Sequence, residues 1–197
     1  LEGEVTIGVV GDTHIPDRVN SLHPDLLPGL AARKVDLILH TGDICKMQVL
    51  EELEQLAPVY AVRGNRDFLL PASIRMVRIL LINSVRILLA HGHVNSWHYW
   101  MDKVEYLAVG YKPERYVRRL HRIDPTAKLI VFGHSHRAEN TVFDDVLYCN
   151  PGSSSSGDLT SSLLSYGIVK ISAAGIVASE IISLEGYRIK AGRWVKT

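Results

Sequence analysis

The sequence has few of the features that mark secreted, membrane or redox proteins. It has two cysteines, Cys45 and Cys149, which are too few for a disulfide framework, and neither lies in a CxxC pair typical of zinc or redox sites. No apolar run approaches the roughly 18 residues that cross a membrane. The first residues also lack the basic start and long apolar stretch of a secretory signal. The sequence therefore predicts a cytoplasmic protein with no membrane partner.

An excess of one charge sign is also absent. Lys and Arg number 22 and Asp and Glu number 21, so the formal net charge is +1, and bulk electrostatics favour neither nucleic acid nor a membrane surface. The sequence shows no long basic groove, which argues against a nuclease. Any binding of anions must come from a local site. Because 47% of the 197 residues are apolar, the chain can bury one substantial core, and we expect a single domain over residues 1–197.

Short aliphatic runs recur along the earlier part of the chain. They lack polar alternation, which is typical of strands buried on both faces. The runs are Val5 to Val10, Leu37 to Leu39, Val59 to Val62, Val85 to Ala90 and Leu129 to Phe132. Apolar residues at helical spacing separate the early runs, around residues 22–30 and 49–56. This strand, helix, strand order predicts α/β layering.

The later part of the chain has a different pattern. Three segments have strand character, namely Thr141 to Cys149, Leu163 to Ile171 and Ile176 to Ile182, and residues 173–175 join the last two. We expect these segments to form antiparallel hairpins on a second sheet. The serine-rich residues between the first two segments predict a polar loop.

Two further segments have helical spacing, and each leaves two roles open. Residues 97–108 gather tryptophan, methionine and aliphatic side chains, either for core packing or as a lid or dimer contact. Residues 113–122 form an amphipathic helix that is either solvated or a surface for a phosphorylated or acidic partner. Its four arginines share one stripe and are Arg115, Arg118, Arg119 and Arg122. Whether the chain forms a homo-oligomer is open.

Five polar motifs each close an apolar run. They are GDTH at 11–14, GD at 42–43, GNRD at 64–67, HGH at 91–93 and GHSH at 133–136. In open α/β sheets, ligands bind beyond the carboxyl ends of the strands, where each of these motifs falls. Asp12 and His14 are two residues apart, as are His134 and His136, and such a pair in extended backbone points to one side. Each pair is therefore expected to face one cavity.

The motifs supply enough oxygen and nitrogen donors for two metal ions. The candidate ligands are Asp12, His14, Asp43, Asn65, His91, His134 and His136. Asp43 is the natural bridge, because the two oxygens of one carboxylate can bind different ions. Two divalent ions would outweigh the two carboxylates in charge, and the positive excess suits a phosphate group. Two ions about 3.5–4 Å apart can also lower the pKa of a shared water and orient a phosphoryl oxygen for in-line attack.

Each candidate ligand has an ordinary explanation when it is taken alone, as a turn residue or a surface imidazole. Independent turns would not repeatedly contain metal ligands, so the set favours a metal site. Other residues of the same types lack the pattern. We expect His40 to be a buried core residue or a support for a ligand, His23 to be exposed, and Cys45 to serve packing.

The order GDTH, GD, GNxD, HGH and GHSH resembles the calcineurin-like metallophosphoesterases over about residues 5–155. The NPGS sequence at 150–153 is similar to a segment of their small prokaryotic phosphodiesterase branch. The resemblance implies a four-layer α/β sandwich of two mixed sheets flanked by helices. It implies that one ion is held by Asp12, His14, Asp43 and His136. It implies that the other is held by Asp43, Asn65, His91 and His134.

One position departs from the family pattern. Many members have histidine after the motif asparagine, where it assists the substrate or protonates the leaving group, whereas this chain has Arg66. An arginine cannot donate a proton at ordinary pH because its pKa exceeds about 12. Its guanidinium can still clamp a phosphoryl oxygen. We therefore expect catalytic roles for Asn65 and Arg66, with the proton supplied by His93 or by solvent.

The sequence as a whole predicts a metal-dependent phosphoric ester hydrolase that acts on a small-molecule phosphoester. A phosphodiesterase is favoured, with a metal-bridging hydroxide attacking phosphorus directly. Donors without a thiolate suit Mn, Fe, Co, Ni or Zn, and the resemblance favours Mn. The alternative is a protein-binding scaffold with little or no activity, because retromer contains a subunit with a similar fold that chiefly binds proteins. Degenerate ligand positions would favour the scaffold, and all seven positions here hold competent residues.

Overall fold

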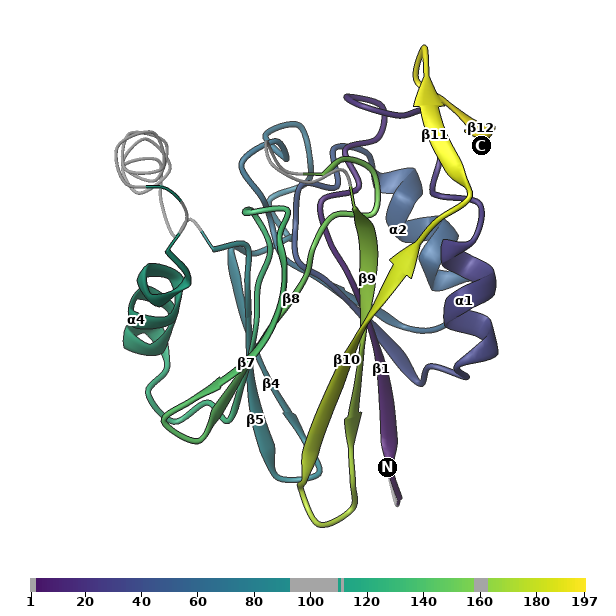
Figure 1. The fold of residues 1–197 in the computed structure, drawn as a ribbon. Helices are drawn as coiled ribbons and strands as arrows, with labels where there is room; N and C mark the ends of the chain where they lie inside the picture. The colour runs from purple at the N-terminus through teal and green to yellow at the C-terminus, as the bar shows by residue number, and fades with distance from the viewer. Residues whose placement is uncertain (1–2, 93–109, 111, 158–162) are drawn as a thin grey trace.

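The computed structural model describes residues 3–92, 110, 112–157 and 163–197. Its centre is formed by two five-stranded sheets (Figure 1). The first sheet has the order β10 (Val177–Leu184), β9 (Leu164–Ile171), β1 (Val5–Val10), β2 (Leu37–His40) and β3 (Val59–Ala61). The second has the order β4 (Val77–Ile82), β5 (Val85–Ala90), β6 (Leu129–Val131), β8 (Val146–Pro151) and β7 (Ala138–Phe143).

Both sheets are mixed. In the first, β1, β2 and β3 are parallel, while β9 runs antiparallel to β1 and β10 antiparallel to β9. In the second, β5, β6 and β8 are parallel, and β4 and β7 are antiparallel edge strands. A separate ribbon pairs β11 (Tyr187–Lys190) with β12 (Arg193–Lys196). The predicted α/β fold with two mixed sheets is confirmed.

Helices cover the outer face of each sheet (Figure 1). Over the described residues, α1 (Leu26–Ala32) and α2 (Met47–Glu54) lie on the first sheet, and α4 (Pro113–Ile123) lies on the second. The helix predicted over residues 113–122 is therefore confirmed, with proline at its first position where no backbone donor is needed. The helix predicted over residues 97–108 lies outside the described residues. In the described part of the chain, no helix has the length and apolar character needed to cross a membrane.

Alternate side chains of the central strands fill different layers of the fold. Val9 on β1 and Leu89 on β5 belong to one buried cluster between the sheets. Val10 packs instead with the residues of α1 and α2, and Leu88 packs with those of α4. Strands that are buried on both faces explain the continuous aliphatic runs in the sequence. The three clusters separate four layers, as the family resemblance implies.

The prediction that the hairpin of residues 163–182 belongs to a second sheet is wrong. This hairpin forms β9 and β10 and extends the first sheet, with β9 antiparallel to β1. Gly167 of β9 lies opposite Val9, and a side chain at Gly167 would meet the Cβ of Val9 at 3.2 Å. The segment predicted as one strand over 141–149 turns at Asp144 and Asp145, which both have positive φ, so it contributes to both β7 and β8 of the second sheet.

Candidate metal centre

The polar motifs meet because they follow the carboxyl ends of parallel strands in the two sheets. Hydrogen bonds join the loops to one another. The backbone N–H of Asp12, after β1, donates to the carbonyl oxygen of Gly42, after β2, at 3.1 Å. The backbone N–H of His134, after β6, donates to Oδ2 of Asp12 at 3.2 Å. The first and second sheets are therefore tied together at this edge.

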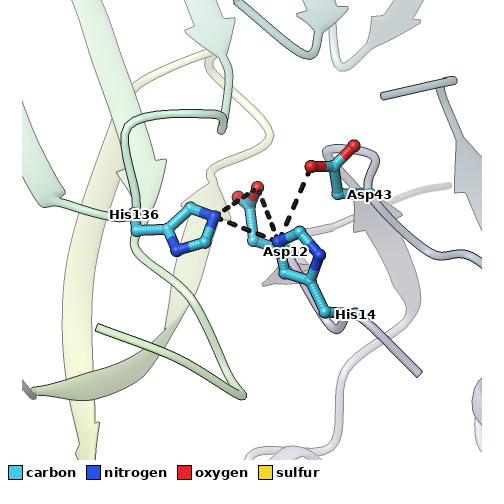
Figure 2. Close-up of side chains that lie close together, drawn as sticks. All are labelled: Asp12, His14, Asp43 and His136. Carbon is cyan, nitrogen blue, oxygen red and sulfur yellow. Dashed lines mark hydrogen bonds and ion pairs between the residues drawn. The ribbon is translucent and has the colours of Figure 1, made fainter. Parts of the chain in front are cut away.

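A first cluster of possible ligands is formed by two carboxylates and two imidazoles (Figure 2). One ligand atom from each of Asp12, His14, Asp43 and His136 lies within 4.8 Å of the others. Nε2 of His14 is 3.1 Å from Nε2 of His136 and 3.6 Å from Oδ2 of Asp43. Nε2 of His136 is 3.3 Å from Oδ1 of Asp12. The donor atoms therefore converge on one point.

This arrangement fits a divalent metal ion. Two imidazole nitrogens at 3.1 Å repel one another unless a proton or a cation lies between them. Oδ1 of Asp12 faces the same point and is a buried oxygen with no hydrogen-bond partner in the described structure. Buried polar atoms in native proteins are normally partnered. Carboxylate oxygen and imidazole nitrogen are common ligands of divalent transition metals, so a cation satisfies all of these atoms together.

A second cluster lies beside the first and includes the remaining predicted ligands. Oδ1 of Asn65 is 3.0 Å from Nε2 of His91 and 2.9 Å from Nδ1 of His134. Oδ1 of Asp43 is 3.5 Å from the same His91 nitrogen. Asp43 thus contributes one oxygen to each cluster. The structure brings together all seven residues that the sequence nominates.

Backbone carbonyls fix the orientation of two imidazoles. Nδ1–H of His91 donates to the carbonyl oxygen of Thr41 at 2.7 Å, and Nδ1–H of His136 donates to that of Ser156 at 3.0 Å. Because a carbonyl can only accept, Nδ1 carries the proton in both rings. Each Nε2 is then left with a lone pair directed into its cluster. This tautomer is the one that a metal-binding histidine requires.

Burial and neighbouring charges shift the pKa values in opposite directions. Burial lowers the pKa of His14 to about 4, although Asp12 opposes the shift. Burial raises the pKa of Asp43 to about 6. Burial acts to raise the pKa of Asp12 as well, but the imidazoles, chiefly His136, outweigh it and hold that pKa well below its usual range. A bound cation would compete with protons for these atoms, so metal affinity should fall in acid.

The backbone of the site is left-handed at five of the seven nominated residues. They are Asp12, His14, Asp43, His134 and His136, with φ between 47° and 75°. The prediction of extended backbone at the pairs Asp12/His14 and His134/His136 is therefore wrong. The side chains of each pair nevertheless face one site. A left-handed conformation costs a non-glycine residue on the order of 1–3 kcal/mol, and such strain concentrates at functional sites.

Residues 5–174 match the calcineurin-like phosphoesterase superfamily domain. The chain belongs to this superfamily. A probable metallophosphoesterase of Methanothermobacter thermautotrophicus is 35% identical over 147 residues, which cover 75% of this chain and 76% of that protein. A probable metallophosphoesterase of Methanocaldococcus jannaschii is 33% identical over 153 residues, covering 78% and 70%. The chain is thus a probable metallophosphoesterase with a buried cluster of aspartate and histidine.

Solved structures share this phosphoesterase fold at lower sequence identity. Vacuolar protein sorting 29 from Cryptosporidium parvum has a TM-score of 0.72 and 19% identity, covering 99% of this chain and 96% of that one. Vps29 of Entamoeba histolytica complexed with Zn²⁺ has a TM-score of 0.66 and 20% identity, covering 92% and 100%. The solution structure of a Thermotoga maritima protein has a TM-score of 0.61 and 27% identity, covering 91% and 99%.

Glycine is required where the phosphoesterase motifs approach one another most closely. A Cβ atom on Gly64 would overlap the backbone nitrogen and the carboxylate of Asp43. A Cβ atom on Gly133 would lie 2.7 Å from Oδ2 of Asp12. The glycines of the GNRD and GHSH motifs therefore allow ligand-bearing loops to pack in direct contact.

Asp67 has a structural role that was not predicted from the sequence. This residue is fully buried, and its carboxylate accepts the backbone N–H groups of Gly64 and Cys45, each at 2.7 Å. It therefore ties the GNRD motif to the loop that follows Asp43. Its place within a motif is a signal that could have identified it. His40 supports the same region as expected, since its buried Nδ1 accepts the N–H of Gly42 at 3.2 Å.

Arg66 lies at the rim of the site. Its backbone N–H donates to Oδ1 of Asp43 at 2.8 Å, while its side chain is 44% exposed. The guanidinium can therefore contact a ligand that enters from solvent. His93, the other nominated catalytic residue, lies outside the described residues.

One arginine of the α4 stripe contacts the loop that follows β5. Arg119 donates from Nη1 to the carbonyl oxygen of Gly92 at 3.1 Å, and its guanidinium carbon lies 5.6 Å from the centre of the Tyr116 ring. Gly92 directly follows the nominated ligand His91. The four arginines therefore do not form one uniform solvated face, although Arg118 is exposed.

Proposed function

We propose that this phosphoesterase is a phosphodiesterase with a dinuclear metal centre. The observation that carries the proposal is the position of Asp43 between the two clusters. Its Oδ2 lies 3.6 Å from Nε2 of His14, and its Oδ1 lies 3.5 Å from Nε2 of His91. A carboxylate shared in this way is the arrangement expected for a bridging ligand in a two-metal site.

Each cluster would supply four donors to one ion. The first ion would be held by Asp12, His14, Asp43 and His136. The second would be held by Asp43, Asn65, His91 and His134. Donors of oxygen and nitrogen without sulfur suit Mn, with Fe, Co, Ni and Zn as alternatives. Mn is our choice, because the sequence motifs resemble those of Mn-dependent members of this superfamily.

The proposed chemistry needs no nucleophile from the protein. When bound, the two ions would polarise phosphoryl oxygens and lower the pKa of a water that attacks phosphorus in line. Arg66 would hold a phosphoryl oxygen through its guanidinium fork, since its backbone is fixed against Asp43 and its side chain reaches solvent. Asn65 would orient the substrate beside it. The leaving group would take its proton from His93 or from solvent.

The assignment as a phosphodiesterase rests on the NPGS segment. Residues 150–153 resemble a segment of the small prokaryotic phosphodiesterase branch, and here they support the GHSH motif directly. The side-chain amide of Asn150 donates to the carbonyl oxygen of Gly133 at 3.2 Å and to Oγ of Ser135 at 2.9 Å. The hydroxyl of Ser153 donates to the carbonyl oxygen of Asp12 at 2.8 Å. The segment thus helps to set the position of the first cluster.

A protein-binding scaffold is the rival hypothesis. The likeness to Vps29 supports a common fold, and a scaffold with this fold does not need convergent metal ligands. In this chain, five nominated ligands keep strained backbone, and carbonyl groups set the tautomer of His91 and His136. Such features have a cost in stability that metal binding explains and a scaffold without metal does not. We therefore favour the enzyme.

The test is hydrolysis of bis(4-nitrophenyl) phosphate and 4-nitrophenyl phosphate with added Mn²⁺. We expect turnover of the diester to exceed that of the monoester, and Asp43→Ala to lower it by at least about 100-fold. Asp25→Ala removes an exposed carboxylate before α1 and should leave the rate unchanged. Equal, near-zero rates for the parent and Asp43→Ala would contradict the enzyme and favour the scaffold. Faster hydrolysis of the monoester would contradict the diester preference.

A further inference from the structure

Asp17 lies behind His14, on the side of the ring that faces away from the first cluster. Nε2 of His14 points into the cluster, so Nδ1 points in the opposite direction. This Nδ1 is buried and has no hydrogen-bond partner in the described part of the chain. Oδ2 of Asp17 is 3.7 Å from it. An imidazole that binds a metal through Nε2 must carry its proton on Nδ1, and here that N–H faces a carboxylate.

The same carboxylate oxygen also faces the rim of the site. Nη1 of Arg66 is 3.8 Å from Oδ2 of Asp17. The backbone of Arg66 is independently fixed, since its N–H donates to Oδ1 of Asp43 at 2.8 Å. One oxygen of Asp17 therefore stands between an inner ligand and the guanidinium nominated to clamp the substrate.

The backbone around Asp17 is held in place. It lies in the turn after His14, where the N–H of Arg18 donates to the carbonyl oxygen of His14 at 2.8 Å. Ile15 and Val19 on either side of it are buried in the core beside α1 and α2. The carboxylate itself is 39% exposed and can be reached by solvent. Asp17 is thus carried by an anchored turn rather than by a free loop.

We propose that Asp17 is a positioning residue that prepares both His14 and Arg66 for the reaction. Its carboxylate attracts the proton of His14 to Nδ1 electrostatically across 3.7 Å, which favours the tautomer whose Nε2 lone pair binds metal. It also holds the guanidinium of Arg66 at the rim, where that group meets the phosphoryl oxygens. The inference rests on the proposed function for its consequence in catalysis. Its effect on the His14 tautomer does not depend on activity.

The expected size of the effect follows from metal sites in general. A carboxylate behind a metal-binding imidazole fixes the ring and raises its basicity, and loss of such a partner typically lowers metal affinity about 10–100-fold. Loss of Asp17 should also release Arg66, which raises KM for the diester. Arg66→Ala should raise KM too but leave metal affinity within about twofold, because Arg66 is not a ligand.

The tautomer is tested in metal-free protein by the ¹⁵N shifts of the His14 ring. We expect the Nδ1–H form in the parent and in Asp17→Glu, which keeps a carboxylate. In Asp17→Asn we expect a mixture of tautomers. Asp25→Asn serves as the matched control, because it removes an exposed carboxylate between the same motif and α1. Identical His14 shifts in Asp17→Asn and the parent would overturn the assignment.

Titration calorimetry with Mn²⁺ and diester kinetics complete the test. We expect Asp17→Asn to bind Mn²⁺ about 10–100-fold more weakly than Asp25→Asn, with Asp17→Glu partly restoring affinity. Equal Mn²⁺ affinity and equal KM in Asp17→Asn and Asp25→Asn would overturn the inference while leaving the proposed function intact. Absence of Mn²⁺ binding and turnover in the parent itself would instead overturn the proposed function.

Discussion

Asp43 and His91 come from different sheets and meet with Oδ1 of Asp43 3.5 Å from Nε2 of His91. Asp43 follows β2 of the first sheet, and His91 follows β5 of the second. The other oxygen of Asp43 is turned toward His14 at 3.6 Å. A single carboxylate therefore couples the two sheets and the two ligand clusters.

Replacing Asp43 should stabilise the metal-free protein and lower its activity. Burial raises the pKa of this carboxyl from 3.8 to about 6, so its ionised form destabilises the metal-free fold. Asp43→Asn keeps the shape and removes the charge. At pH 7.5 we expect the metal-free variant to be more stable by on the order of 1–3 kcal/mol, with metal-dependent turnover at least about 100-fold lower. Urea unfolding with a chelator present measures the first quantity.

The pH dependence of that gain provides the control. A raised carboxyl pKa means that the folded state binds the proton more tightly than the unfolded state between pH 3.8 and about 6. The stability of the parent relative to Asp43→Asn is therefore highest below pH 3.8 and falls as the pH rises through 6. If Asp43→Asn were more stable than the parent by the same amount at pH 4 and at pH 7.5, this explanation would be contradicted.

Gly64→Ala should damage the site through steric overlap. The new methyl group would meet the backbone nitrogen and carboxylate of Asp43, so the GNRD loop must move away. We expect a loss of about 1–3 kcal/mol in stability and a marked loss of Mn²⁺ affinity. Gly186→Ala is the control, because nothing lies within 4 Å of its Cβ position. Its left-handed backbone predicts a cost of about 1 kcal/mol and unchanged Mn²⁺ affinity.

The candidate ligands could be predicted from the sequence because each follows a short aliphatic run. Strand ends at one edge of a sheet bring distant motifs together, so the order of motifs carried the information. Local geometry did not follow from the same pattern. The backbone at Asp12 and His14 was expected to be extended but is left-handed. Hydrogen bonds from their N–H groups to the carbonyl oxygens of residues 42 and 43 hold these positions. Such bonds depend on the neighbouring loop, which no local pattern reveals.

The layers of the fold were predicted more securely than the pairing of its strands. The residues of β9 and β10 have a local pattern typical of a hairpin, but nothing in it specifies β1 as the neighbour.

The burial of His23 also depends on residues that are distant in the sequence. His23 was expected to be exposed, yet it is 2% exposed because Tyr187 and Trp194 of the terminal ribbon pack on its ring. Whether residues 1–197 form a single domain stays a prediction.

His40→Asn should reduce the loss of stability that metal-free protein shows as the pH falls below 6.5. Burial lowers the pKa of His40 from 6.5 to about 3, so below pH 6.5 the unfolded chain binds a proton that the folded chain does not. Stability from this group is therefore complete above pH 6.5 and is lost by about 1.4 kcal/mol per pH unit toward pH 3. Asparagine can still accept the N–H of Gly42 without titrating.

Urea unfolding between pH 4 and pH 8 measures the change. Below pH 6.5, we expect the free energy of unfolding to change less steeply with pH in the variant. The slope should decrease by about 1.4 kcal/mol per pH unit, which corresponds to one proton. The same slope in both proteins would show that His40 does not stay neutral in the folded state. His14 also has a lowered pKa, so the slope of the variant should not reach zero.

Variants of Arg66 should separate charge from geometry. Its guanidinium fork can hold two phosphoryl oxygens, whereas the ammonium of lysine is a point charge. We expect Arg66→Lys to lower kcat/KM for the diester about 10-fold and Arg66→Ala about 100-fold or more. Steady-state kinetics with saturating Mn²⁺ measure both. Equal kcat/KM in the parent and Arg66→Ala would remove Arg66 from the proposed mechanism.

The most direct test of the central claim is an anomalous difference map from a crystal of the protein grown with Mn²⁺. We predict two peaks about 3.5–4 Å apart, with the carboxylate of Asp43 between them. One peak should lie among Asp12, His14 and His136, and the other among Asn65, His91 and His134. A single peak, or no peak at Asp43, would contradict the dinuclear centre.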